Sequence, residues 1–232
     1  ECTHEYWRSN GKFTPNITLR LASGGYIGGG LYHSQNLEGA LTTLPGARIV
    51  CPSFADDAAG LLRTSMRSKG FTLYLEPKAL YNSVEAAAVV PEEFEVPFGK
   101  ARIRREGTDL TIITYGNTTH FCLDVAERLA REGVGSVEVI DLRSLIPLDK
   151  EAIFASVRKT GKVMVVHEDK VFSGFGAEIA AQIAGEMFRY LDAPVQRVGS
   201  TFTPVGFNPI LERAILPNDE KIYKAAKELL EF

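Results

Sequence analysis

Short runs of β-branched and aliphatic residues alternate with amphipathic segments along most of the chain, and this alternation constrains the fold more than any other feature. In the first part of the sequence, the pattern predicts strands at 17–21, 48–51 and 71–75 and helices at 35–44 and 56–67. Parallel strands need a long crossover connection, and a helix usually supplies it. The order strand, helix, strand, helix, strand therefore predicts a parallel sheet with helices on both faces.

The same alternation returns in the second half of the chain. It predicts strands at 109–115, 137–140, 162–166 and 195–198, and helices at 118–131, 149–159, 177–190 and 219–230. Gly133 and Gly161 follow two of these helices, at the position where glycine commonly ends a helix. Both halves are therefore predicted to be α/β, and the second to be built on a mostly parallel sheet.

Residues 82–98 interrupt this pattern. They contain two prolines and four acidic residues, no basic residue and no sustained hydrophobic period. We predict a linker here, so that a first domain with the linker occupies 1–95 and a second domain occupies 96–232. A long loop within one domain is the alternative.

The composition excludes several classes of protein. The 232 residues carry 26 basic and 29 acidic side chains, a formal net charge of −3, which gives no electrostatic basis for binding nucleic acid. No apolar run is long enough to cross a membrane. Cys2, Cys51 and Cys122 are far apart and form no C-x-x-C pair, so we predict a reducing compartment, the cytoplasm, and no thiolate metal site.

The glycine-rich segment 24–30 is the first candidate for chemistry, because glycine lets backbone amides approach an anion closely. It does not match the dinucleotide-binding pattern G-x-G-x-x-G, and the chain has no G-x-x-x-x-G-K-[ST] motif. We therefore predict a flexible loop that shapes a cleft. His33 follows it, near the start of a predicted helix and at the strand ends where open α/β sheets bind ligands. There His33 could transfer a proton or donate to an anion, and a purely structural histidine is the alternative.

A second candidate for chemistry directly follows the predicted strand 162–166. His167, Glu168 and Asp169 could form a histidine–carboxylate pair, but a polar strand end is the interpretation that we favour. No set of His, Asp and Glu residues has the spacing of a metal site, and no G-x-S-x-G motif supports a serine hydrolase. The residues alone therefore predict a two-domain α/β protein with a cleft at His33.

Many short motifs follow the glycine-rich segment in a fixed order. They are YHSQ at 32–35, VCPS at 50–53, LEPK at 75–78, PFGKA at 97–101, EGTD at 106–109, ITYG at 113–116, DLR at 141–143, PLD at 147–149, VHED at 166–169 and GFGAE at 174–178. In these motifs and their order, the chain resembles the beta subunits of the thiamine-diphosphate-dependent 2-oxo acid dehydrogenases, of the branched-chain type. The match covers essentially the whole chain.

The resemblance implies a partial transketolase-like pyrimidine-binding domain followed by a transketolase C-terminal domain with a mostly parallel sheet. It implies oxidative decarboxylation of 2-oxo acids with acyl transfer to lipoamide, and thiamine diphosphate and magnesium as cofactors. The implied partners are an alpha subunit or alpha-like domain, a second beta copy and a lipoyl acyltransferase, with 96–232 used for assembly. His33 is the implied catalytic residue, assisting proton transfer. In a eukaryote the implied compartment is the mitochondrial matrix.

The sequence departs from the family in two places. The family's first residues, which include the glutamate that activates the cofactor, have no counterpart here, and the G-D-G…N motif that holds diphosphate and magnesium belongs to the partner subunit. We therefore assign no cofactor-binding residue and no metal ligand, and we expect the chain alone to be inactive. The chain opens at Glu1 without an initiator Met, which we interpret as processing or as a piece of a longer polypeptide.

The substrate prediction rests on three of the motifs. Residues 76–78, 167–169 and 174–176 resemble the branched-chain members more than the pyruvate members, so we predict acids of the 3-methyl-2-oxobutanoate type. A pyruvate dehydrogenase beta subunit, a non-catalytic assembly fragment, and a relative of transketolase or acetoin dehydrogenase are the alternatives.

Overall fold

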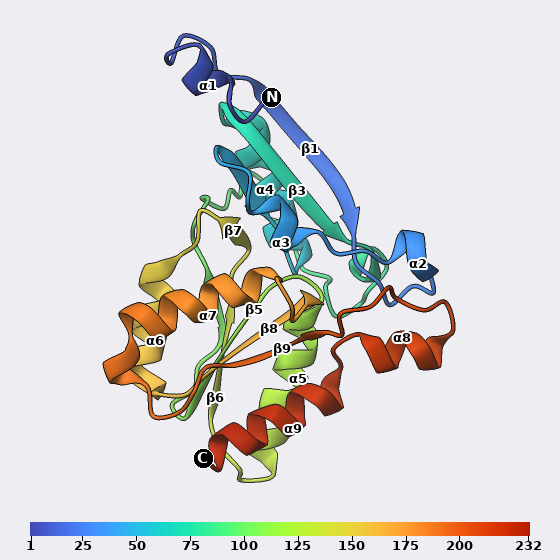
Figure 1. Cartoon of the computed structure of the whole chain (residues 1–232), viewed down its shortest axis with the longest axis vertical. Helices are drawn as coiled ribbons and strands as arrows, with labels where there is room; N and C mark the ends of the chain where they lie inside the picture. Colours follow the sequence, from blue (N-terminus) through green and yellow to red (C-terminus); the bar gives the residue numbers. More distant parts are fainter.

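Two β-sheets with flanking helices make up the chain in the computed structural model, which describes residues 1–232 (Figure 1). Sheet A has the order β1–β3–β2–β7, formed by Asn16–Ser23, Gly70–Pro77, Ala47–Val50 and Ser144–Ile146. β1, β3 and β2 are parallel, and β7 is antiparallel to β2. Because β7 comes from far along the chain, the second half of the sequence completes the sheet of the first half.

Sheet B has the order β4–β6–β5–β8–β9, formed by Arg102–Arg105, Val137–Asp141, Leu110–Thr114, Val163–Lys170 and Gln196–Ser200. Its strands are parallel except for β4, which is antiparallel to β6. Every residue of β5 and β6 is buried, as expected for central parallel strands between two layers of helices. Ile112 and Ile113 of β5 belong to different apolar clusters, since successive strand residues point to opposite faces.

Helices cover both faces of sheet B (Figure 1). The helices are α1 (Glu5–Arg8), α2 (Gly30–His33), α3 (Glu38–Leu41), α4 (Ala55–Arg67), α5 (Thr118–Arg131), α6 (Lys150–Thr160), α7 (Phe175–Glu186), α8 (Pro209–Ile215) and α9 (Asp219–Leu230), with short 3-10 turns at Lys78–Leu80 and Phe188–Tyr190. α6 and α7 pack on the face of Ile113, and α5 and α9 pack on the face of Ile112. None of these helices is both long and apolar enough to cross a membrane.

Local sequence explains where α6 and α9 begin. Asp149 Oδ1 accepts a 3.1 Å hydrogen bond from the N–H of Ala152, and Asn218 Oδ1 accepts one of 3.1 Å from the N–H of Lys221. These side chains satisfy amides that have no partner within the first turn of a helix. Gly161 follows the last residue of α6 with a φ of 67°, a left-handed conformation that glycine adopts readily.

The predicted α/β class and all seven predicted strands are confirmed, as are the helices predicted at 56–67, 118–131, 149–159 and 219–230. The extent of the helix predicted at 35–44 is wrong: only Glu38–Leu41 is helical, because the Gln35 carbonyl accepts a hydrogen bond from Gly24 instead. The helix predicted at 177–190 begins at Phe175 and ends at Glu186. Residues 82–98 contain no helix or strand, and the division into two domains at this segment stays a prediction.

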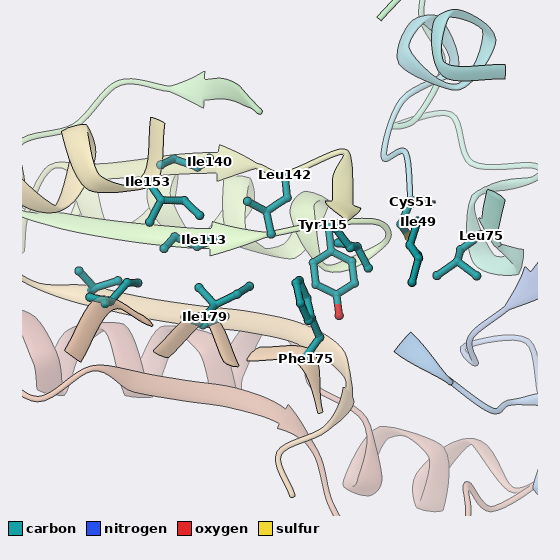
Figure 2. Close-up of a cluster of buried hydrophobic side chains, with 14 of the residues drawn as sticks. Ile49, Cys51, Leu75, Ile113, Tyr115, Ile140, Leu142, Ile153, Phe175 and Ile179 are labelled. Carbon is teal, nitrogen blue, oxygen red and sulfur yellow. The ribbon is translucent and has the colours of Figure 1, made fainter. Parts of the chain in front are cut away.

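One hydrophobic core crosses both sheets. Ile49 and Leu75 of sheet A and Ile113 and Ile140 of sheet B belong to a single cluster of 18 buried residues. Figure 2 shows Tyr115, at the end of β5, between the side chains of the two sheets. Because the two sheets share this core, we expect them to lose their packing together on unfolding.

Buried charges join α4 to sheet B. Asp57 of α4 accepts a 2.8 Å hydrogen bond from Nη1 of Arg143 and a further hydrogen bond from Arg104. Arg104 Nη2 also donates to Asp141 Oδ2 at 2.7 Å. The side chains of both carboxylates are fully buried, and those of Arg104 and Arg143 are only 8% and 9% exposed. Because a buried charge needs a partner, these four side chains fix α4 against sheet B.

Candidate functional site

The glycine loop, residues 24–30, connects the carboxyl end of β1 to α2. Gly24 and Gly28 have φ angles of 87° and 64°, in the left-handed region that favours glycine. The missing side chain of Gly24 matters for a second reason, because a Cβ there would lie 2.7 Å from Oε1 of Glu168. The backbone of the loop can therefore adopt these φ angles and approach Glu168 closely only because glycine stands at these positions.

Backbone amides of the glycine loop bind the chain's own carboxylates. The N–H of Gly25 donates to Oε1 of Glu168, and the N–H of Gly28 donates to Oε1 of Glu212 at 3.3 Å. The hydroxyl of Tyr26 donates to the carbonyl oxygen of Pro217 at 2.6 Å. Instead of a flexible loop, the structure therefore has one that is held at three points by distant parts of the chain.

His33 is the last residue of α2, rather than near the start of a helix, and its side chain is exposed. Its carbonyl oxygen accepts a 2.6 Å hydrogen bond from Nζ of Lys78, directly after β3. The imidazole is thus open to solvent on a segment whose backbone is tied to sheet A. A reactant carried by another molecule can reach such a group, and the proton-transfer role of His33 stays a prediction.

Three carboxyl groups lie buried near the glycine loop: Glu38 of α3, and Glu168 and Asp169 of β8. Burial and the neighbouring Asp169 raise the pKa of Glu38 to about 8, so this side chain is mostly protonated at neutral pH. Burial also raises the pKa of Glu168, and the hydrogen bond from Gly25 opposes that rise. Asp169 Oδ2 accepts a 3.0 Å hydrogen bond from the N–H of Gly39. One acid is therefore neutral, and the other two hold backbone amides on either side of His33.

His167 is fully buried beside these acids. Its ring is nearly parallel to that of Tyr115, with centroids 6.3 Å apart and 8° between the planes. Gly176 packs closely against it, and a Cβ on that glycine would lie 2.3 Å from Nε2 of His167. Burial lowers the pKa of His167 to about 4, so the imidazole is neutral at neutral pH. Neither ring nitrogen of His167 has a hydrogen-bond partner, so the structure shows no histidine–carboxylate pair in the VHED motif.

The residues of this chain do not fit the diphosphate and magnesium that the resemblance implies. No group of three or more His, Cys, Asp and Glu side chains is arranged to hold a metal ion. The amides of Gly25 and Gly28 already donate to carboxylates, so the glycine loop does not offer them to a phosphate. No residue is therefore assigned to either group.

Residues 99–222 match the family model described as transketolase, C-terminal domain. The chain is 40% identical over 227 residues to a protein named 2-oxoisovalerate dehydrogenase subunit beta from Bacillus subtilis, a match that covers 97% of this chain and 69% of the relative. The chain belongs to the family of 2-oxo acid dehydrogenase beta subunits. It is also 41% identical over 226 residues to a beta-subunit relative from Staphylococcus aureus named pyruvate dehydrogenase E1 component subunit beta, which covers 97% of this chain and 69% of that relative.

A solved structure named split gene transketolase, inactive beta4 tetramer, matches this beta-subunit chain with a TM-score of 0.74 at 23% identity. The match covers 94% of this chain and 67% of that one, and at this identity it shows the fold alone. The resemblance indicated by the ordered motifs is thus confirmed, together with the transketolase-like fold.

The glycine loop and His33 of this beta-subunit chain are predictable from the local sequence, but two of the groups that hold the loop are not. Glu212 and Pro217 lie in and just after α8, where no element was predicted. A local signal for this helix was present: Asn208 caps its start by accepting a 2.8 Å hydrogen bond from a backbone amide, and Pro209 follows at the first helical position.

Proposed function

We propose that this chain is part of the decarboxylating component of a branched-chain 2-oxo acid dehydrogenase. That enzyme oxidatively decarboxylates acids of the 3-methyl-2-oxobutanoate type and transfers the acyl group to lipoamide. The observation that carries the reaction class in this proposal is the 40% identity to the Bacillus subtilis 2-oxoisovalerate dehydrogenase subunit beta over 97% of the chain. A histidine on a rigidly held, exposed segment supports it.

In this proposal His33 is the catalytic residue of the chain. When a lipoyl disulfide is acylated and reduced, the leaving sulfur takes up a proton. An imidazole can supply that proton near neutral pH, and a positioned general acid accelerates such a step. The exposed side chain of His33 suits this role, because the lipoyl group arrives on another protein.

We propose that thiamine diphosphate and magnesium bind to segments or to a partner outside residues 1–232. We therefore expect the chain alone to be inactive. The proposed partners are an alpha subunit or alpha-like domain, a second beta copy and a lipoyl acyltransferase. Residues 96–232 are the proposed assembly domain, and 1–95 the proposed part of the pyrimidine-binding domain with its linker. The proposed compartment is the bacterial cytoplasm, or the mitochondrial matrix in a eukaryote.

The branched-chain preference rests on motifs that lie against the segment carrying His33. Lys78 of the LEPK motif binds the His33 carbonyl, and Glu168 of the VHED motif binds the amide of Gly25. Pyruvate is the alternative substrate, because the identity to the Staphylococcus aureus pyruvate dehydrogenase beta subunit is 41%. A non-catalytic assembly fragment is the other alternative, because the chain itself fits neither diphosphate nor magnesium.

The experiment compares two steps in the full-length parent protein, assembled with its alpha partner, thiamine diphosphate and magnesium. Decarboxylation of 3-methyl-2-oxobutanoate is followed with an artificial electron acceptor, and acyl transfer with a lipoyl domain. We expect His33→Ala to lower acyl transfer about 100-fold relative to decarboxylation, as for loss of a general acid. His4→Ala, at another exposed histidine, should change neither rate.

Unchanged acyl transfer in His33→Ala would contradict the catalytic role. If the unmodified enzyme turned over neither the branched acid nor pyruvate, the assembly fragment would be the better description of the chain.

A further inference from the structure

Two carboxylates hold the glycine loop from distant parts of the chain. Glu168, on β8, accepts a hydrogen bond from the N–H of Gly25, and Glu212, on α8, accepts one of 3.3 Å from the N–H of Gly28. Only 6% of Glu168 and 8% of Glu212 is exposed. A buried carboxylate is costly unless it accepts hydrogen bonds. The loop amides therefore stabilise this carboxylate pair, Glu168 and Glu212, while the pair fixes the loop.

The fit between the glycine loop and its surroundings leaves little room for another arrangement. A Cβ at Gly24 would lie 2.7 Å from Glu168 Oε1, and one at Gly25 would lie 2.8 Å from Cδ1 of Leu216. Between the two anchored amides, the ring of Tyr26 packs against Phe121 with centroids 5.4 Å apart. The loop is thus confined by contacts as well as by hydrogen bonds.

The restraint extends to His33 because little chain separates it from the anchors. His33 ends the four-residue helix α2, which begins at Gly30. On its other side, Lys78 Nζ holds the His33 carbonyl oxygen at 2.6 Å, and the carbonyl oxygen of Gln35 accepts a 3.0 Å hydrogen bond from the N–H of Gly24. The segment from 24 to 35 is therefore closed on itself, so a shift of the loop moves α2 with it.

We propose that Glu168 and Glu212 are positioning residues for His33, which hold the imidazole where acyl transfer requires it by binding the glycine-loop amides. This inference rests on the proposed role of His33. Hydrogen bonds from amides to carboxylates are charge-assisted and stronger than those between neutral groups. A displacement of about 1 Å in a catalytic group can lower a rate about 100-fold, so loss of one anchor is expected to affect catalysis.

Glu212 is the better position for substitution, because it is the only buried residue of α8 and most of that helix is exposed. Glu212→Ala leaves the amide of Gly28 without its acceptor, whereas Glu212→Gln keeps an acceptor oxygen of nearly the same shape. Glu151→Ala is the matched control, since Glu151 is an acid of α6 whose side chain is 90% exposed.

Two measurements on the assembled enzyme test the inference. The first is amide hydrogen exchange of the peptide that covers 24–33, which reports on the hold of the loop and does not depend on activity. The second is a ratio of two rates: acyl transfer to a lipoyl domain, divided by decarboxylation with an artificial electron acceptor. The KM for 3-methyl-2-oxobutanoate is determined in the same kinetic measurement.

We expect Glu212→Ala to accelerate exchange about tenfold, the effect of losing one hydrogen bond to a charged group. Acyl transfer relative to decarboxylation should fall by about 10- to 100-fold, the larger value corresponding to a displacement of about 1 Å, with KM unchanged. Glu212→Gln should recover part of both effects, because its neutral amide oxygen accepts a weaker hydrogen bond than the carboxylate does, and Glu151→Ala should match the unmodified enzyme.

Unchanged hydrogen exchange in Glu212→Ala would show that Glu212 does not hold the glycine loop. Faster exchange with an unchanged ratio of acyl transfer to decarboxylation would contradict the positioning role. An equal loss of both rates with no recovery in Glu212→Gln would also overturn it, since it would indicate a general structural defect. If His33→Ala itself leaves acyl transfer unchanged, the proposed role of His33 fails and the positioning role with it. The exchange measurement still shows whether the carboxylate pair holds the loop, so the two failures are distinguished.

Discussion

Replacing Asp57 with alanine tests the buried charges between α4 and sheet B. The substitution removes the acceptor that lies 2.8 Å from Arg143 Nη1 and one of the two carboxylates beside Arg104. Arg104 keeps Asp141, and Arg143 keeps two backbone carbonyl oxygens at 2.8 to 3.1 Å. Breaking a buried ion pair costs about 3–5 kcal/mol, and the partners that remain place this loss near the lower end, at about 3 kcal/mol.

Asp56→Ala is the matched control. Asp56, whose side chain is 17% exposed, pairs at 3.0 Å with Arg102, whose side chain is 45% exposed, and such a partly exposed pair contributes about 1 kcal/mol. The assay is urea and thermal unfolding followed by circular dichroism. We expect Asp57→Ala to lower the free energy of unfolding by about 3 kcal/mol and Tm by about 6–12 °C, at about 2–4 °C per kcal/mol. A loss no larger than that of Asp56→Ala would refute the reasoning.

Three further predictions concern packing and protonation. Gly176→Ala should lower Tm, because its Cβ would lie 2.3 Å from the buried His167, whereas Gly185→Ala, at an open position in the same helix, should stabilise by up to about 1 kcal/mol. Equal shifts in thermal melts would contradict this. The pKa of Glu38 rises from 4.5 to about 8 in the folded state, which therefore binds this proton more tightly than the unfolded chain. The free energy of unfolding should fall as pH rises from about 4.5 to about 8, by up to about 1.4 kcal/mol per unit, and Glu38→Gln should remove this decline. An unchanged pH profile in that variant would show that Glu38 is not the group responsible. Ile113→Ala should cost about 2–5 kcal/mol in urea unfolding without a second transition, because its cluster spans both sheets, and two separate transitions would contradict the shared core.

The strands could be predicted where the signal is local. β5 is an unbroken buried run, which is typical of a central parallel strand. β4 and β7 could not be predicted, because β4 consists mostly of arginine and β7 has only three residues. The pairing of β7 with β2 depends on the approach of distant parts of the chain, which no local pattern encodes.

The candidate site could likewise be predicted only in part. The glycine loop and His33 could be located because a run of glycines after a strand is a local signal. Glu168 and Glu212 could not be connected to it, since their hydrogen bonds to the loop span 143 and 184 positions of the sequence. Their role depends on the packing of α8 and β8 around the loop.

The most direct test of the proposed function is the ratio of kcat/KM for 3-methyl-2-oxobutanoate to that for pyruvate. It is measured with an artificial electron acceptor on the full-length parent protein, assembled with its alpha partner, thiamine diphosphate and magnesium. We predict a ratio of at least about ten in favour of the branched acid, since even one extra methylene group in an apolar pocket changes specificity by about that factor. A higher value for pyruvate would contradict the branched-chain assignment, and turnover of neither acid would contradict the proposed reaction itself.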